Sequence, residues 1–446
     1  MSSSTEAVPR LTRVLGLWDL VFYGIVLIQP IAAVGLFGVA QQLSRGQMVT
    51  TVLIAMCAMM LTAVSYGRMA SVYPSAGSAY TYVSRGLNAH IGFLAGWAMV
   101  LDYLIVPIVS MIYAALTLTR LVPGVPYAAW VVLLTLLITG LNLAGIRSAA
   151  KSNIVLLFVM CLVIGWFFVM AVRYLALHGG AHALFSLQPV YDPAEFNLHA
   201  VFTATSFAAL TYIGFDGVTT LAEDVKNPRR NVLIATVLVC LLTGLMSSLQ
   251  IYLAARVWPA YNNFPNVETA FLDVCGRAGG PWLFQGMAVT LLVACIGTTL
   301  TGQLGAARLL YGMGRDGVLP RSAFGRLNPH GTPVFNMLLI GGITLAGSLL
   351  MNYEHAAEVL NFGAFIAFMG VNLAALRTFY RRGSFASLWR DLAAPIAGFL
   401  FCAVIWVSLP RLAKEIGATW LIVGLIYLAT LTRGFNRAPA QLHFSE

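Results

Sequence analysis

Long apolar runs recur along the whole of this 446-residue chain, and the polar stretches between them are short. Each run is close to the ~20 residues that a helix needs to cross the hydrocarbon core of a bilayer. Charged residues make up only 9% of the chain, whereas soluble domains carry about 25%. So few charges could not cover a soluble surface, and no charged stretch is long enough to be a separate domain. The pattern therefore predicts an all-α polytopic membrane protein.

The apolar runs predict twelve transmembrane helices. They are expected at residues 17–41, 48–70, 89–119, 127–146, 152–175, 199–221, 232–256, 281–312, 333–350, 356–377, 393–410 and 417–433. The first run is too long for a signal peptide and lacks a clear cleavage site. We therefore expect residues 1–16 to form a cytoplasmic segment before an uncleaved first span.

The distribution of Lys and Arg predicts the orientation, because cytoplasmic loops are enriched in both. With a cytoplasmic N-terminus, 19 of the 26 basic residues lie on the cytoplasmic side, Arg381 and Arg382 among them. The even number of spans then places the tail, residues 434–446, in the cytoplasm as well. This asymmetry accounts for the net charge of +10 without a nucleic acid partner. The expected location is the plasma membrane, which is the inner membrane in a Gram-negative bacterium.

Helix-breaking residues interrupt both the first and the sixth run. The first carries Gly24 and then Gln29 and Pro30, and the sixth carries Asp216 between Gly214 and Gly217. Unwound backbone inside a membrane is tolerated only where it is buried in protein or lines a wet cavity, and its half-helix ends can then bind a cargo. Glycines that only permit close helix packing are the alternative. The matched pair of interruptions, with an acid in one of them, favours a true break.

Paired interruptions at corresponding positions indicate a transporter built from inverted repeats. Residues 17–175 and 199–377 would form two five-helix repeats of opposite orientation. Residues 393–433 would add two peripheral helices.

Two of the 16 acidic residues, Asp102 and Asp216, lie well inside apolar runs, and Asp19 and Glu223 lie near the ends of runs. An ionised carboxylate at the bilayer centre costs roughly 2.5–3.5 kcal/mol on insertion scales. No Lys or Arg stands in the middle of a run as a partner. The partner of each acid is therefore a cation from outside, a proton or a polar neighbour on another helix. Alternatively, Asp102 could brace a nearby helix break.

Aromatic residues stand near these acids, namely Tyr23, Tyr103, Tyr212 and Phe215. Aromatic rings attract amine cations, so the group could line a cationic site together with the acids. Any one of these rings alone is explained more simply by packing.

Sequence motifs of other protein classes are missing. The histidines and the six cysteines have no metal-ligand or disulfide spacing, so no metal site and no cofactor is predicted. No GxSxG, HExxH or Walker loop occurs, and no nucleophile–base set indicates a membrane enzyme. An ion channel is disfavoured because the interruptions are paired and do not form a repeated filter.

Three strings resemble the amino acid–polyamine–organocation superfamily of secondary transporters, and the resemblance covers nearly the whole chain. They are "YPSAGSAYTYVSRGLNAHIGFLAGW", "FDGVTTLAEDVKNPRRN" and "ARLLYGMGRDGVLP". The strings "LDYLIVP", "GFDGVTTLAE" and "LNFGAFIAFMGVNL" are most similar to the putrescine importer branch. The resemblance implies a LeuT-like fold with discontinuous helices one and six, and alternating access around a central site.

The resemblance also implies which helices line that site, namely helices one, three, six and eight. The implied substrate-binding residues are Tyr23, Gly24, Gln29, Asp102, Tyr103, Tyr212, Gly214, Phe215, Asp216, Gly217 and Thr298, with Thr299 and Gln303 as further candidates. Leu210 stands where relatives often carry an aromatic gate, so Phe207 or Tyr212 is expected to take that role.

Two departures from the superfamily pattern affect the expected cargo. Relatives commonly have a run of small residues at the first break, where backbone amides hold a carboxylate, but this chain has "GIVLIQP". The bulkier stretch favours a mainly cationic cargo. Some proton-coupled members carry a lysine in the fifth span, and "NIVLLFVMCLVIGWFFVM" has none.

The sequence thus predicts a secondary transporter that imports a small amine such as putrescine, coupled to protons or working by exchange. An amino acid permease or exchanger of the same superfamily is the alternative. The exact substrate, the coupling ion, the oligomeric state and the direction of transport stay open.

Overall fold

The computed structural model describes residues 14–74, 78–144, 150–179, 184–222, 224–315, 317–328, 331–381, 387–437 and 439. Several residues named above lie outside this described part, namely residues 1–13, Arg382, Glu223 and residues 440–446.

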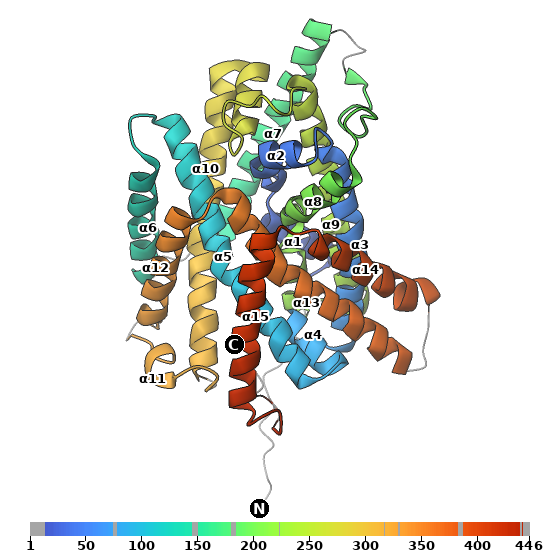
Figure 1. Cartoon of the computed structure of the whole chain (residues 1–446), viewed down its shortest axis with the longest axis vertical. Coiled ribbons are helices and arrows are strands. Elements are labelled where there is room, and N and C mark those ends of the chain that lie inside the picture. Colours follow the sequence, from blue (N-terminus) through green and yellow to red (C-terminus); the bar gives the residue numbers. More distant parts are fainter. Residues whose placement is uncertain are drawn as a thin grey trace, which may run out of the picture.

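Helices make up nearly all of the described structure (Figure 1). The α-helices are α1 (Leu17–Ile28), α2 (Ala32–Leu43), α3 (Met48–Val72), α4 (Ser78–Gly86), α5 (Ala89–Leu121), α6 (Tyr127–Leu143), α7 (Ala150–Gly179), α8 (Leu198–Ala208), α9 (Pro228–Val257), α10 (Ala270–Arg315), α11 (Arg321–Phe324), α12 (Val334–Leu350), α13 (Tyr353–Arg381), α14 (Ala394–Val407) and α15 (Arg411–Leu431). Shorter 3₁₀ or π segments are η2 (Ala209–Tyr212), η3 (Phe215–Leu221) and η4 (Trp389–Ala393). Within the described residues, one bridge joins extended backbone, between Leu15 and Val225.

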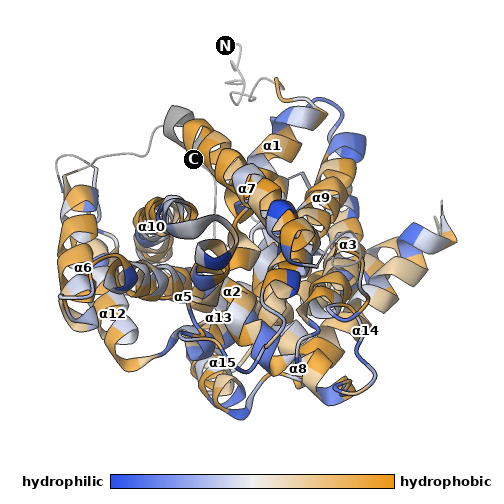
Figure 2. Ribbon diagram, turned by 90° about the horizontal axis from the view of Figure 1, so that it is seen from above, coloured by the Kyte–Doolittle hydropathy of each residue, from blue (hydrophilic) through white to orange (hydrophobic). Residues whose placement is uncertain are grey.

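Nine helical segments of the described chain are long and apolar enough to cross a membrane. The pair α1 and α2, bent by 50°, is a further candidate span, and α6 and α12 are shorter apolar helices. Seen from above, hydrophobic residues dominate most helices and hydrophilic ones gather at their ends and in loops (Figure 2). The chain is a multi-pass membrane protein, as the sequence predicts.

The first span is interrupted between α1 and α2. Gln29 ends α1 with a φ of 68° and a ψ of 129°, a backbone conformation that residues with a side chain rarely adopt. Pro30 follows and has no N–H with which to continue the helix. The carbonyl oxygen of Pro30 accepts a hydrogen bond of 2.9 Å from the Gln250 side chain of α9. A neighbouring helix thus satisfies backbone that the break sets free.

The sixth span is interrupted at Gly214. Regular α-helix ends at Ala208, and the chain continues through η2 to Gly214, whose φ is 110°. This left-handed conformation favours glycine. A new 3₁₀ turn, η3, begins at Phe215 and brings Asp216 into its first turn. Helical geometry therefore stops at both places where the sequence predicts an interruption.

The helices α5 and α13 are the most buried of the candidate spans. In both ribbon views α6 and α12 lie side by side at one edge, next to α5 and α10, while α3, α9 and α14 lie on the other side (Figures 1 and 2). The interrupted segments α1–α2 and α8–η3 thus stand between two groups of continuous helices.

The structure contains helical turns in stretches that the sequence analysis treated as loops. The short helix α4 lies between the second and third predicted spans. The helix α10 begins at Ala270, although the apolar run begins only at residue 281. Gly280, with a φ of 74° and a ψ of −168°, marks a kink within α10. The run of small residues at this kink explains why the sequence pattern placed the start of the span there.

The two longer polar loops are tied to helix ends and to each other. The Tyr261 hydroxyl donates a hydrogen bond of 2.9 Å to Glu195 Oε2, and this bond raises the pKa of Tyr261. The Tyr252 hydroxyl of α9 donates to the carbonyl oxygen of Leu184 at 2.7 Å. These contacts fix the loops over one end of the helical bundle.

Candidate functional site

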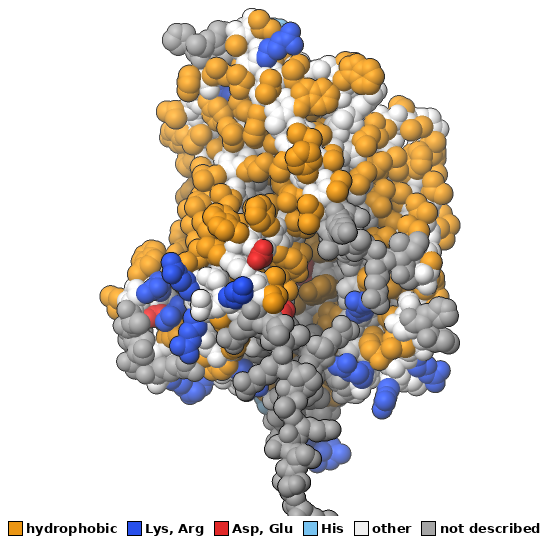
Figure 3. All heavy atoms as spheres, turned by 180° about the vertical axis from the view of Figure 1, so that it is seen from behind, with side chains coloured by type: hydrophobic (Ala, Val, Ile, Leu, Met, Phe, Trp, Pro, Cys, Tyr) orange, Lys and Arg blue, Asp and Glu red, His pale blue; other side chains and the backbone are white. Residues whose placement is uncertain are grey.

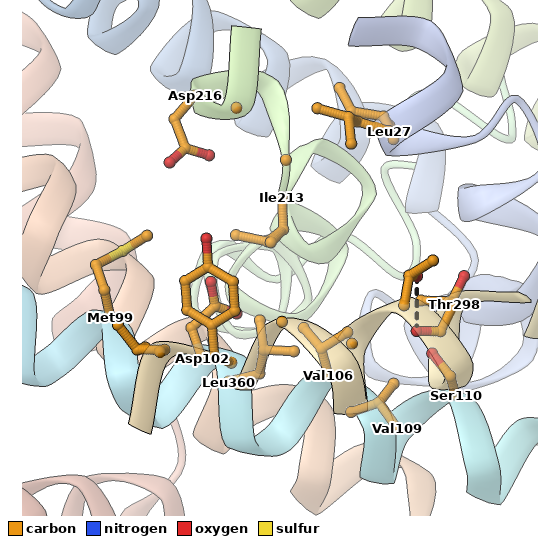
Figure 4. Close-up of a pocket in the computed structure, with 18 of the residues that line it drawn as sticks. Leu27, Met99, Asp102, Val106, Val109, Ser110, Ile213, Asp216, Thr298 and Leu360 are labelled. Atoms are coloured by element: carbon orange, nitrogen blue, oxygen red, sulfur yellow. Dashed lines mark hydrogen bonds between the residues drawn. The ribbon is translucent and has the colours of Figure 1, made fainter. Parts of the chain in front are cut away.

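A cavity of about 800 Å³ lies where the two interrupted segments face α5 and α10. Gln29 lines it from the first break, Gly214 and Asp216 from the second, and Asp102 from α5. Figure 4 shows Asp102 and Asp216 within this lining. Residues that are far apart in the sequence therefore meet at one site in the middle of the bundle.

One face of α5 and one face of α10 form the continuous walls of this cavity. Met99, Asp102, Val106, Val109 and Tyr113 recur at intervals of three or four residues along α5, which is the spacing of a single helix face. On α10 the cavity-lining residues are Leu291, Ala294, Cys295, Thr298, Thr301, Gly302, Gly305, Arg308, Leu309, Tyr311, Gly312, Met313 and Arg315. The cavity therefore extends from the middle of the bundle to the last residue of α10.

The two mid-span acids both line the cavity, yet each is only 8% exposed. The Asp216 carboxylate points into the space between η3 and α5 (Figure 4), and the Ser78 hydroxyl lies 3.5 Å from its Oδ2. Asp102 Oδ1 has no hydrogen-bond partner among the described residues. Burying such an acceptor without a partner is costly. A cargo that donates hydrogen bonds or carries positive charge would satisfy it.

Tyr103, which follows Asp102 on α5, also lines the cavity and is 43% exposed. An exposed aromatic ring beside two carboxylates can cover the apolar part of an amine and attract its charge.

A second group of polar side chains lies farther along α5 and α10. Gln29 Nε2 donates a hydrogen bond of 3.0 Å to Thr298 Oγ1, and Ser110 lines the same region (Figure 4). The cavity therefore has an acidic part around Asp102 and Asp216 and a neutral polar part around Gln29.

Beyond this polar part, closely packed aromatic rings close the cavity. The rings of Tyr113 and Tyr353 lie 5.2 Å apart. A methyl group on Gly35 would come within 3.1 Å of the Tyr353 hydroxyl and 3.3 Å of the Tyr113 ring, so three elements meet here without free space. Farther out, Arg120 of α5 forms an ion pair with Asp273 of α10.

The opposite end of the cavity, along the last turns of α10, is lined by Arg308 and Arg315, and both are exposed. We call this end the mouth of the cavity, defined by Arg308, Tyr311, Gly312 and Arg315. The cavity thus has buried acids at its centre and arginines at its mouth.

Seven of the residues proposed from the sequence line the cavity, namely Gln29, Asp102, Tyr103, Gly214, Asp216, Gly217 and Thr298. Gly24 lies outside the lining, where an added methyl group would come within 2.5 Å of Val239 and 2.8 Å of Val218. Gly24 thus permits close packing of α1 on α9 and η3. Tyr23 also lies outside the lining, with 37% of its area accessible, but its side chain hydrogen-bonds to that of Thr220, which lines the cavity.

The three remaining aromatic candidates pack into the protein and do not line the cavity. The Tyr212 hydroxyl donates to the carbonyl oxygen of Val52 in α3 at 2.8 Å. Phe215 packs against Tyr66 with a ring distance of 5.4 Å. Phe207 is fully buried, and its ring lies edge-on to Tyr353 at 6.2 Å. Of the three, Phe207 alone contacts the closed end of the cavity.

The two further candidates of α10 are also turned away from the cavity. Thr299 Oγ1 donates to the carbonyl oxygen of Cys295 at 2.8 Å. Gln303 Oε1 accepts from Asn142 of α6 at 3.3 Å. Both side chains therefore serve contacts within or between helices.

Sequence reasoning missed several lining residues, above all Ser78, Tyr113, Tyr353 and Arg308. Tyr113 could have been found by extending the spacing of Asp102 and Val106 along α5. Ser78 lies on the unpredicted short helix α4, and Tyr353 begins α13 after a turn, so no periodic pattern leads to either. Arg308 is one of the 19 basic residues that the sequence assigns to the cytoplasmic side, and its charge there indicates orientation only.

Comparison with known proteins identifies the family of this chain. Residues 26–412 match the amino acid permease family. The chain belongs to this family. Its members are membrane transport proteins, and the cavity of this permease lies between its interrupted helices.

Individual relatives differ in the cargo that their names state. The permease is 31% identical to the low-affinity putrescine importer PlaP of Escherichia coli over 439 residues, which cover 97% of this chain and 96% of PlaP. It is 24% identical to the branched-chain amino acid permease BcaP of Bacillus subtilis, over 98% of this chain and 96% of BcaP. It is 29% identical to the vacuolar cationic amino acid transporter 4 of Arabidopsis thaliana, over 76% of this chain and 58% of that protein.

Proposed function

We propose that this permease is a secondary active transporter that imports a small amine such as putrescine by alternating access. The observation that carries the proposal is the buried Asp102 carboxylate in the cavity lining, whose Oδ1 has no hydrogen-bond partner among the described residues. The match to a putrescine importer along nearly the whole chain supports the same cargo class.

In this proposal the two acids divide the work of binding a diamine. Asp102 and Asp216 each accept hydrogen bonds from one ammonium group, because a charge-assisted hydrogen bond is about twice as strong as a neutral one. Tyr103 covers the methylene chain between the two amino groups. Gln29 and Thr298 line the adjoining polar part of the cavity, and Gly214 and Gly217 provide the backbone of the second break.

The centre of the cavity offers little to a carboxylate. In the described lining, the basic side chains are Arg308 and Arg315 at the mouth. The side-chain amide of Gln29 already donates to Thr298. A neutral α-amino acid that binds its ammonium group at Asp102 or Asp216 would bring its carboxylate close to the same acid, because both groups are bonded to one carbon, and like charges repel.

An amino acid permease or exchanger is the second candidate. Two relatives are named as amino acid transporters, one for branched-chain and one for cationic amino acids. A cationic amino acid could place its side-chain amine against Asp102 and turn its carboxylate toward the mouth.

We also propose twelve spans, with residues 17–175 and 199–377 as inverted repeats and residues 393–433 as peripheral helices. Nine long helices, the bent pair α1–α2 and the short apolar helices α6 and α12 support this count. On the face in Figure 3, hydrophobic side chains cover a broad band and most visible Lys and Arg side chains gather toward its lower end. This supports a plasma-membrane protein with both termini in the cytoplasm, and the mouth would then open to the cytoplasm.

Competition between putrescine and ornithine tests the proposed cargo, because ornithine is putrescine with one added carboxylate. Binding of radiolabelled putrescine to the purified permease in nanodiscs should be displaced by putrescine and only weakly by ornithine. Binding of radiolabelled ornithine that unlabelled ornithine displaces and putrescine does not would assign the amino acid function. The coupling, by protons or by exchange, is tested by imposing a pH gradient or by loading amines inside vesicles.

A further inference from the structure

The charges along the cavity change sign between its centre and its mouth. Asp102 and Asp216 are buried at the centre, whereas Arg308 and Arg315 line the mouth. Thr301, Arg308 and Arg315 are seven residues apart on α10, which places them on one face of the helix. A cargo that leaves through the mouth must therefore pass along these arginines.

Arg308 is the arginine nearer to the centre. Its side chain is exposed, and it forms no ion pair with another described residue. Arg68 of α3, by contrast, forms an ion pair with Asp391. Arg308 therefore keeps its full charge available to the cavity.

The effect of this charge on a bound cargo can be estimated from the helix geometry. Arg308 stands three residues beyond Gly305 on α10, about 4.5 Å along the helix axis, and Gly305 lies beside the Tyr103 ring that covers the proposed cargo. Protein walls of low dielectric concentrate the field of such a charge in a cleft. For a guanidinium roughly 10 Å from the amine and an effective dielectric constant of about 50, one unit charge changes the affinity for a monocation by roughly threefold and that for a dication by roughly tenfold.

We propose that Arg308 determines the charge selectivity of the mouth. Its positive charge weakens the binding of a cationic cargo when the site is open to this side, and it speeds the release of that cargo through the mouth. The inference rests on the proposed amine cargo. Arg308 cannot change the final concentration gradient, which the driving force sets. It changes the affinity of the site when the mouth is open and the rate at which the cargo leaves.

A carboxylate-bearing cargo would give Arg308 the opposite role. If the permease carries a cationic amino acid, the Arg308 guanidinium attracts the carboxylate of the cargo, and replacement of Arg308 by a neutral residue weakens binding. If Arg308 serves only orientation in the membrane, its replacement leaves both affinities unchanged.

The test compares inside-out with right-side-out membrane vesicles, with putrescine as the dication and butylamine as the monocation. The variants are Arg308→Gln, Arg308→Met and Arg308→Lys, with Arg390→Gln as the control, since Arg390 is exposed and does not line the cavity. In the orientation that exposes the mouth, both neutral variants should bind putrescine roughly tenfold and butylamine roughly threefold more tightly. Arg308→Lys and Arg390→Gln should match the wild type, and high salt should reduce the difference.

Several results would overturn the proposal. The first is an equal change in affinity for the two amines, and the second is an Arg308→Lys variant that binds like the neutral variants. The third is a change in affinity in both vesicle orientations, and the fourth is weaker amine binding in both neutral variants. Two neutral variants are used so that poor folding of one does not decide the outcome. If the wild type binds no amine on either face, the proposed function fails, whereas amine binding without an effect of Arg308→Gln contradicts only this inference.

Discussion

Gln29 Nε2 donates a hydrogen bond of 3.0 Å to Thr298 Oγ1, and this contact joins the break in the first span to the middle of α10. The backbone of Gln29 has a φ of 68°, and such strain is retained where the surrounding structure enforces it, often at functional sites. The bond to Thr298 is one of the contacts that hold this conformation in place. Its loss should therefore affect transport more than it affects folding.

Thr298→Val removes this hydrogen bond at nearly constant volume. A net hydrogen bond contributes about 0.5–1.5 kcal/mol, so we expect kcat/KM for uptake to fall roughly two- to tenfold. Thr301→Val is the matched control, because Thr301 also lines the cavity but its hydroxyl bonds only within α10, to the carbonyl oxygen of Gly297. Equal losses in both variants would exclude a special role of the bond to Gln29.

Asp216→Asn and Asp102→Asn remove one negative charge each from the cavity wall. Hydrogen bonds to charged groups contribute about 1.5–3 kcal/mol, so each change should lower kcat/KM for amine uptake by roughly one to two orders of magnitude. Folded protein should still reach the membrane, as gel filtration after extraction can check. Glu415→Gln, at an exposed position, is the control. Wild-type uptake by Asp216→Asn would remove Asp216 from the site.

Gly214→Ala should destabilise the protein, because Gly214 has a φ of 110° and a side chain in left-handed backbone costs about 1–2 kcal/mol. Gly165→Ala is the comparison. Gly165 lies within α7 with open space around it, and alanine is there the better helix former by about 1 kcal/mol. Thermal unfolding in detergent should give a lower midpoint for the first variant and an unchanged or higher one for the second. A tolerated Gly214→Ala would contradict the described break.

Arg381→Ala and Arg382→Ala should each leave transport near normal, because we interpret both residues as orientation signals. Arg381 is exposed and does not line the cavity, while Arg382 lies outside the described residues. Initial uptake rates per folded molecule are the measurement. A loss of transport in either single variant, with normal insertion, would show that this loop takes part in the transport cycle.

The all-α membrane architecture could be predicted because each apolar run has the length of a span and no soluble surface could be built from the rest. The two breaks could also be predicted, since Pro30 and Gly214 disturb helices by their own chemistry. The start of α10 and the short helix α4 could not, because both depend on contacts with other helices and not on an apolar run.

Within the site, regular helices were more predictable than broken ones. Asp102 and Tyr103 stand on the continuous helix α5, where a spacing of 3.6 residues per turn assigns a face. Tyr212 ends the 3₁₀ segment η2 and Phe215 begins η3, on either side of the left-handed Gly214. A 3₁₀ helix has 3.0 residues per turn. A helical pattern could not tell which way their rings turn, and the structure directs them into the packed interior.

The most direct test of the proposed function is uptake of radiolabelled putrescine into proteoliposomes under an imposed pH gradient, with unlabelled diamines and neutral amino acids as competitors. We predict saturable uptake that diamines inhibit and neutral amino acids do not, with a strong loss in Asp102→Asn. No putrescine uptake, together with exchange of an amino acid by the same vesicles, would contradict the account and assign this permease to the transport of amino acids.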